Sequence, residues 1–197
     1  MGIKNILVIF TFASLLVLSG CNTVENKTIS GSRLVVLSVT GKDLDGTEGS
    51  TTIFSDVLTQ GGIFNDNGVA EFTAQLLDPA KTPAESTYYN DIVVDQVDVE
   101  YSRADGQNVQ GQDVPYSFSQ KVYAIVEIAD TTELPFVLIP HTAKIEPPLI
   151  HLVRSGAEKI LKLEAKVTFH GKDLGDNRIE PVVGYVSVWC ANFADPD

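Results

Sequence analysis

Hydrophobic and polar residues alternate with a period of two in the C-terminal part of the chain. Between residues 161 and 170, apolar side chains occupy every second position and polar ones lie between them: Leu161, Leu163, Ala165, Val167 and Phe169 are the apolar set. Successive side chains of a strand point to opposite faces, so this pattern predicts a strand with one buried face.

A second run from residue 183 to 193 predicts the partner of this strand. Turn-forming residues 171–177 separate the two runs, which indicates a C-terminal hairpin. Val186, Val188 and Cys190 share one parity of the second run. A free cysteine in that position is typically a small buried hydrophobe, with a reactive thiol as the alternative.

Six further segments are rich in β-branched and aromatic residues, and turn formers separate them. They are Leu34–Thr40, Thr51–Leu58, Val69–Leu77, Ile92–Ser102, Ser117–Ile128 and Leu134–His141. No stretch has a sustained helical period, although Ile150–Leu163 can hold one short turn. The pattern predicts an all-β fold, an antiparallel immunoglobulin-like β-sandwich of about eight strands. A closed barrel is the main alternative.

The first residues differ from this pattern. Lys4 precedes an apolar stretch from Ile6 to Leu18, the order of a secretion signal. The stretch is short for a membrane-spanning helix, which needs about 20 residues. Leu18-Ser19-Gly20-Cys21 follows and resembles the lipobox of bacterial lipoproteins. The resemblance implies that residues 1–20 are removed and that Cys21 becomes a lipidated, acylated first residue.

Several acyl chains on Cys21 would hold the protein on the membrane durably, since each buried CH2 contributes about 0.8 kcal/mol. Asn22 follows the cysteine, where aspartate marks retention in the inner membrane of enteric bacteria. We therefore expect a lipid-anchored envelope protein, in the outer membrane rather than the cell membrane. Residues 21–32 are polar and predict a flexible tether, followed by one β-sandwich domain over 33–197.

Four short segments resemble a group of uncharacterised lipoproteins from Gram-negative bacteria. They are Tyr-Ser-Arg-Ala-Asp-Gly at 101–106, Asp-Val-Pro-Tyr at 113–116, Lys-Ile-Glu-Pro-Pro-Leu at 144–149, and Phe-Ala-Asp at 193–195. The resemblance covers roughly residues 90 to 197 and implies a secreted β-sandwich. It brings no established activity, so it assigns no functional residue.

The net charge indicates which classes of partner the protein can bind. The formal net charge is −12, and the leader contains Lys4 and no acid, so the mature chain is one unit more negative. Such a surface disfavours nucleic acid. It suits cations, basic proteins or simple solubility. After lipidation of Cys21 only Cys190 remains, which excludes an internal disulfide.

Catalytic signatures are missing from the sequence: there is no Gly-x-Ser-x-Gly, His-Glu-x-x-His, Cys-x-x-Cys or phosphate-binding loop. We therefore expect no enzyme activity, although catalytic triads also assemble from distant residues. His141, His151 and His170 are spaced too irregularly to indicate a shared metal site. His170 lies on the polar parity of its strand and is expected at the surface.

Two turns carry oxygen-bearing side chains of the kind that calcium prefers. They contain Asp43, Asp45 and Glu48 in the first turn, and Asp173, Asp176 and Asn177 in the second. Calcium is the only cofactor these residues suggest. The alternative is an ordinary turn, because Asp and Asn also bond their own backbone.

Aromatic residues offer a further hypothesis, a carbohydrate platform. The candidates are Tyr88, Tyr89, Tyr116, Tyr123, Tyr185 and Trp189. In a sandwich, however, most of them are expected in the core or in cross-strand pairs.

Taken together, these features favour a non-catalytic envelope module that binds or assembles with another envelope protein. The alternatives are an enzyme with an unrecognised site and a calcium- or carbohydrate-binding surface module. Strand addition at an exposed sheet edge is one concrete binding route.

The lipobox generates the first prediction. Cys21→Ser should abolish acylation and release or mislocalise the protein, because the acylated thiol is lost. Mass spectrometry of the mature N-terminus checks this. An unmodified mature protein that begins at another residue would contradict it.

Overall fold

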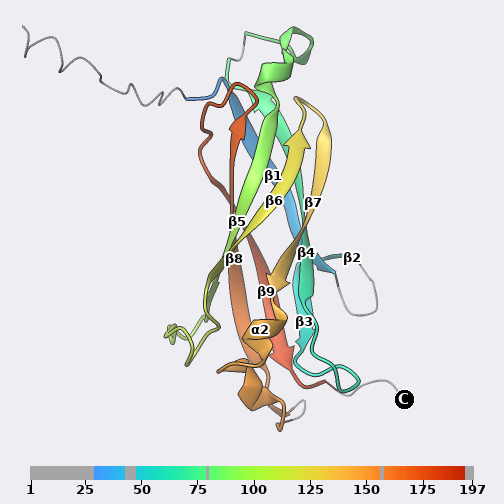
Figure 1. Ribbon diagram of the computed structural model, residues 1–197, viewed down its shortest axis with the longest axis vertical. Helices are drawn as coiled ribbons and strands as arrows, with labels where there is room; N and C mark the ends of the chain where they lie inside the picture. The colour runs from blue at the N-terminus through green and yellow to red at the C-terminus, as the bar shows by residue number, and fades with distance from the viewer. Residues whose placement is uncertain (1–28, 43–47, 79, 156–157, 194–197) are drawn as a thin grey trace, which may run out of the picture.

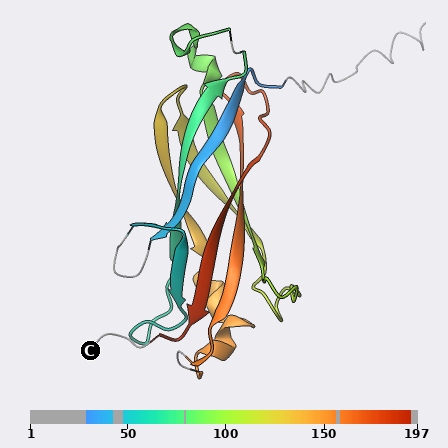
Figure 2. The same ribbon diagram turned by 180° about the vertical axis from the view of Figure 1, so that it is seen from behind.

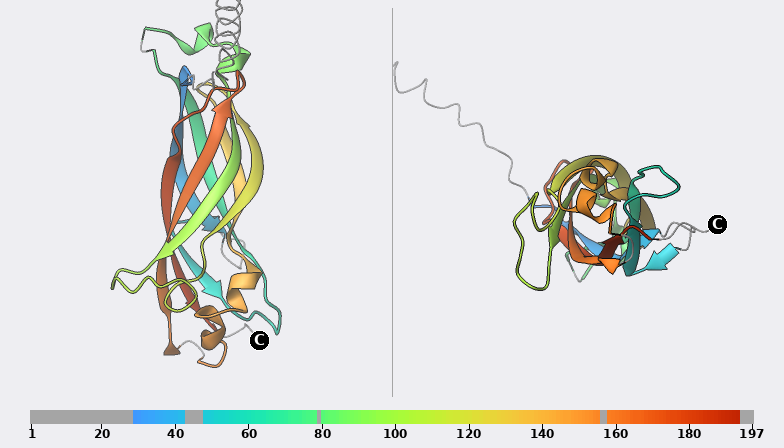
Figure 3. Two further views of the ribbon diagram at one scale, coloured as in Figure 1. Left: turned by 60° about the vertical axis from the view of Figure 1, so that its left-hand side comes forward. Right: turned by 90° about the horizontal axis from the view of Figure 1, so that it is seen from below.

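Two β-sheets form the protein in the computed structural model, which describes residues 29–42, 48–78, 80–155 and 158–193. The four-stranded sheet has the order β2-β1-β4-β7, and the five-stranded sheet has the order β3-β9-β8-β5-β6. Figure 1 shows them as one elongated sandwich, and the view along its axis in Figure 3 shows both sheets curving around a common core. The strands are β1 (Ser32–Lys42), β2 (Glu48–Ser50), β3 (Thr52–Asp56), β4 (Asp66–Leu76), β5 (Ile92–Ser102), β6 (Phe118–Val126), β7 (Thr131–Ile139), β8 (Leu161–Asp173) and β9 (Val182–Ala191).

The predicted all-β sandwich is confirmed. Each of the eight predicted segments contains a strand, and β8 and β9 are antiparallel neighbours as the hairpin prediction requires. The short β2 is an additional strand. One pair departs from the antiparallel expectation, since β3 runs parallel to β9. The chain crosses between the sheets at Thr51, and β3 then joins the free edge of the last strand.

Among the described residues, helical structure is confined to short connections. They are η1 (Pro83–Glu85), η2 (Tyr88–Asn90), α2 (His141–Lys144) and η3 (Leu149–Leu152). The last of these overlaps the predicted short turn. Within the described part of the chain, no helix is long and apolar enough to cross a membrane. The leader, Cys21 and most of the predicted tether lie outside the described residues.

Three aromatic rings join the two sheets at the centre of the core. Phe169 of β8 contacts Phe72 of β4 and Phe136 of β7, with ring centroids 4.8 and 5.7 Å apart and edge-to-face geometry. Each such pair stabilises the fold by about 0.5–1.5 kcal/mol beyond the contribution of the buried apolar area. Cys190 is also fully buried, as predicted, and burial raises the pKa of its thiol to about 12. The thiol is therefore held in its protonated, unreactive form.

A buried ion pair lies at the end of the sandwich that carries α2. The Lys144 ammonium donates to Asp66 Oδ1 and to the Asp56 carbonyl oxygen, each at 2.8 Å. Ser55 donates to the other oxygen of Asp66. Burial raises the pKa of Asp66, and the Lys144 ammonium and the Ser55 hydroxyl oppose this rise. The pair therefore fastens α2 to strands β3 and β4.

Removal of the Lys144 ammonium should lower the free energy of unfolding. Lys144→Met leaves the Asp66 carboxyl buried without its counter-charge, which typically costs about 3–5 kcal/mol. Urea unfolding at neutral pH measures the loss. The double variant Lys144→Met/Asp66→Leu removes both charges and should recover most of it. A single variant as stable as the double would contradict this role.

Candidate functional site

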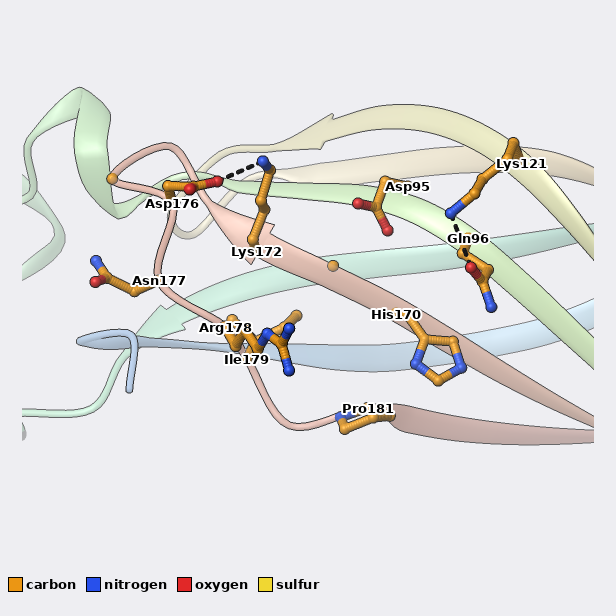
Figure 4. Close-up of a pocket in the computed structure, with 12 residues that line it drawn as sticks. Asp95, Gln96, Lys121, His170, Lys172, Asp176, Asn177, Arg178, Ile179 and Pro181 are labelled. Carbon is orange, nitrogen blue, oxygen red and sulfur yellow. Dashed lines mark hydrogen bonds and ion pairs between the residues drawn. The ribbon is translucent and has the colours of Figure 1, made fainter. Parts of the chain in front are cut away.

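A polar groove opens on the outer face of the five-stranded sheet, with a volume of about 750 Å³. Volumes of this order are typical of small-ligand sites. It lies over β5, β6 and β8 and the connection between β8 and β9, as Figure 4 shows. Its lining residues are Asp95, Gln96, Lys121, His170, Gly171, Lys172, Gly175, Asp176, Asn177, Arg178, Ile179 and Pro181.

Strand register brings these side chains together. Gln96 of β5 lies opposite His170 of β8 on one side and Lys121 of β6 on the other. The register shifts between Val94 and Gln96 in both pairs. Against β8, Val94 and Gln96 pair with the consecutive residues Gly171 and His170, so Asp95 is the additional residue of a β-bulge. Bulges commonly re-aim side chains beside functional sites. Here the bulge contributes the carboxyl group of Asp95 to the groove.

Gly171 allows the closest approach of the two central strands. A Cβ atom at this position would lie 2.3 Å from the carbonyl oxygen of Val93. Real Cβ atoms do not approach an oxygen so closely, so any other residue would push β8 away from β5. Gly171, which the sequence placed in a turn, is thus required for the close packing of β5 and β8 beneath the groove.

Positive charge gathers in the groove although the protein is acidic. Lys121 Nζ donates to Gln96 Oε1 at 2.8 Å, and Lys172 forms an ion pair with Asp176. This hydrogen-bonded pairing raises the pKa of Lys172. The Arg178 guanidinium is exposed and has no ion-pair partner among the described residues. In Figure 4 it lies below Lys172 and to the left of His170.

His170 is a paired side chain at the margin of the groove. The structure places it at the sheet surface as expected, but only 34% of the side chain is exposed, and its Nε2 lies 2.7 Å from Asp98 Oδ2. Partial burial would raise the pKa of Asp98, but hydrogen bonds from Ser119, Gln96 and His170 outweigh it and lower the pKa.

The Ser119 hydroxyl lies beside the Asp98 carboxylate and helps to lower its pKa. In a nucleophilic triad the hydroxyl bonds to the imidazole and the carboxylate orients the ring from its other side. Among the described residues no hydrogen bond joins Ser119 to His170, and the imidazole pairs with Asp98.

Asp173 organises the turn at the upper end of the groove. Its two carboxylate oxygens accept hydrogen bonds from the backbone and side-chain nitrogens of Asn177 at 2.9 to 3.1 Å. Asp176 has a positive φ of 66° and pairs with Lys172 instead. The structure thus brings Asp173 and Asn177 together and directs Asp176 to a lysine.

The first predicted calcium turn lies largely outside the described residues. Asp43 and Asp45 are not described, and Glu48 is described only through its backbone in β2. Among the described residues, no group of three or more His, Cys, Asp or Glu side chains is placed to hold a metal ion. Calcium at either turn stays a prediction.

The expectation that most aromatic candidates lie in the core or in cross-strand pairs is wrong for the core. Tyr88, Tyr89, Tyr116, Tyr123 and Tyr185 all have exposed side chains. They occur on different strands and loops, and only the first two form a ring contact with one another. Trp189 alone makes a cross-strand contact of the expected kind, with Phe54 at 5.6 Å and with Lys162 over its ring. Tyrosine's hydroxyl tolerates solvent, which alternation of polarity alone does not reveal.

Sequence reasoning did not identify Gln96, Lys121 or Arg178 as site residues. The polar parity of Gln96 on β5 and Lys121 on β6 indicates the outer face, but only the register pairs them. Arg178 joins them from the connection between β8 and β9, where no strand pattern applies. No protein-family model matches this chain, and no curated protein matches it.

The hydrogen bonds of Asp173 generate a stability prediction. Asp173→Ala should destabilise the protein by about 1–3 kcal/mol at pH 7, because the bonded groups of Asn177 lose their acceptor. Burial would raise the pKa of Asp173, but hydrogen bonds from Ser30 and Asn177 outweigh it and lower the pKa. Its contribution is therefore complete above about pH 4 and disappears as the pH falls through the folded-state pKa.

Urea unfolding at pH 7 and pH 3 measures this difference, with the exposed Asp176→Ala as the control of smaller effect. An equal cost at both pH values would contradict the assignment. Calcium titration of the same proteins tests the cation hypothesis. A melting temperature raised by calcium and restored by EDTA, in the unmodified protein and not in Asp173→Ala, would support a calcium site at this turn.

Proposed function

We propose that this chain is a lipid-anchored, non-catalytic binding module of the bacterial cell envelope. Its outer-face groove binds an anionic group of a partner protein, either a carboxylate or a phosphate. The observation that carries this proposal is the Arg178 guanidinium, which has no ion-pair partner among the described residues and lines the same groove as Lys121 and Lys172, in a protein of net charge −12.

The chemistry of arginine supports an anionic ligand. Its planar guanidinium presents paired N–H donors that match a carboxylate or phosphate, and it stays charged at every physiological pH. Lys121 of β6 and Lys172 of β8 add charge from the two strands on either side of β5. Asp95 and Asp176 in the same groove would oppose a large anion, so the groove favours one small anionic group over a polyanion.

Anchoring is supported by the leader and by Leu18-Ser19-Gly20-Cys21. The first described residue, Ile29, lies at one end of the long sandwich (Figures 1 and 2). Its backbone forms a bridge with Arg178, and Ser30 N donates to Arg178 O at 3.1 Å. The tether, predicted to continue to Ser32, is therefore attached to the sandwich from Ile29, directly beside the groove.

Strand addition is a less favoured binding route at the edges where β6 and β7 face each other. The side-chain amide of Gln120 donates to Val137 O at 2.7 Å and accepts from Val137 N at 2.9 Å. It thus occupies backbone groups that a partner strand would need. Pro135 removes a further donor from β7. Blocked edges of this kind limit pairing with other chains.

An enzyme remains the alternative class, followed by a calcium- or carbohydrate-binding module. Substrate turnover by the purified protein would favour the first. The Asp98, His170 and Ser119 geometry supports binding instead, because the serine is not bonded to the imidazole.

Charge reversal in the groove tests the proposal. Arg178→Glu should weaken partner binding about tenfold or more, since a charge-assisted hydrogen bond contributes about 1.5–3 kcal/mol. Arg154→Glu is the matched control, with the same charge change at an exposed arginine outside the groove. Crosslinking in cells and affinity purification of the anchored proteins identify the partner, and calorimetry with that partner measures the affinities.

Three outcomes are informative. Loss of the partner with Arg178→Glu and its retention with Arg154→Glu would support the groove. Equal retention by both variants would exclude it as the binding surface. If the anchored protein emerges alone and a soluble form lacking Cys21 turns over a substrate, the enzyme alternative replaces the binding module.

A further inference from the structure

Exposed apolar and aromatic side chains lie at the end of the sandwich where the described chain begins. Ile29 is 79% exposed, Tyr88 67% and Tyr89 66%, and Leu77 is exposed beside them. In Figure 1 the segment with η1 and η2 projects from this end, above the start of β1. Contacts confirm that these pieces are neighbours, since Leu77 N donates to Gly31 O at 2.8 Å.

Hydrogen bonds between side chains and backbone hold the segment that carries Tyr88 and Tyr89. Thr82 N donates to Glu85 Oε2 at 2.7 Å, and Thr87 N donates to Asn90 Oδ1 at 2.8 Å. These are two successive capping boxes, one at the start of η1 and one at the start of η2. The second encloses Tyr88 and Tyr89, whose rings meet edge to face at 6.2 Å. Their exposure is therefore imposed by the local backbone.

Chain length brings this end close to the lipid anchor. Eight residue steps separate Cys21 from Ile29. Even fully extended, they span at most about 29 Å. An acylated Cys21 thus keeps Ile29, and with it this end of the sandwich, within about 29 Å of the bilayer surface.

Tyrosine is suited to the boundary between lipid and water. Its ring is apolar and its hydroxyl is polar, and tyrosines are enriched at both interfaces of membranes. Asp78 and Glu85 outnumber Lys81 among the exposed charged side chains of the same segment, so anionic lipids would be repelled and zwitterionic headgroups are favoured. The contact can be weak by itself, because the anchor raises its effective concentration.

We infer that Tyr88 and Tyr89 enter the headgroup region of the membrane that holds the anchor, and that the sandwich stands end-on upon it. This inference rests on the lipid anchoring in the proposed function. It adds an orientation: the groove lies on the flank of the sandwich near the membrane.

Fluorescence quenching tests the inference in the lipidated protein. Tyr88→Trp or Tyr89→Trp is reconstituted in phosphatidylcholine vesicles whose acyl chains carry bromine, a contact quencher of tryptophan. The matched control is Tyr116→Trp, an equally exposed tyrosine on the loop before β6, at the opposite end. The native Trp189 lies near the end of β9, also far from the anchor, and supplies the same background in every variant.

We expect emission of Tyr88→Trp and Tyr89→Trp to fall in brominated vesicles relative to unbrominated ones, while Tyr116→Trp stays unchanged. Mass spectrometry of each preparation first establishes lipidation, and its absence would refute the anchoring itself. Lipidated variants in which neither end is quenched would overturn the inference alone. Quenching of Tyr116→Trp as well would overturn the end-on orientation, and protection of Tyr88 and Tyr89 only by a protein partner would assign this end to that partner.

Discussion

Burial of one face of each sheet against the other is the constraint on which this structure depends. The edge-to-face contacts of Phe169 with Phe72 and Phe136 lie at the centre of that interface. Because the described part of the chain contains no disulfide to supplement this packing, its free energy of folding comes from the apolar inner faces. The outer faces are then free to carry polar and charged side chains, and the groove is made from these.

At both ends of the sandwich, buried charged side chains have hydrogen-bond partners. Lys144 and Asp66 satisfy one another at the end of the sandwich near α2, and Asp173 satisfies the backbone of the turn at the other end. Asp66 lies where β3, β4 and α2 meet, and Asp173 lies where β8 enters the turn before β9. The physical rule is the same in each case, since a buried polar group is tolerated only with its partners.

The positions of the groove and of Tyr88 and Tyr89 together define how the proposed module would be oriented on the membrane. Arg178 contributes its backbone to the attachment of the first described residues and its side chain to the groove. A partner bound there would lie beside the tether and close to the bilayer. This arrangement favours a partner in the same membrane over one that arrives from a distance.

The alternation of apolar and polar residues by itself determined the strands, the sandwich and the buried position of Cys190. Side-chain direction in a strand has a period of two, so these properties are local. Tertiary structure alone decided the parallel pairing of β3 with β9, the Lys144–Asp66 pair and the assembly of Gln96, Lys121 and Arg178 in one groove. Each of these depends on contacts between segments distant in sequence, and the groove also depends on a bulge at Asp95 that no local pattern reveals. The exposed tyrosines belong to the same class, because a residue with an apolar ring and a polar hydroxyl suits core and surface alike until packing selects one.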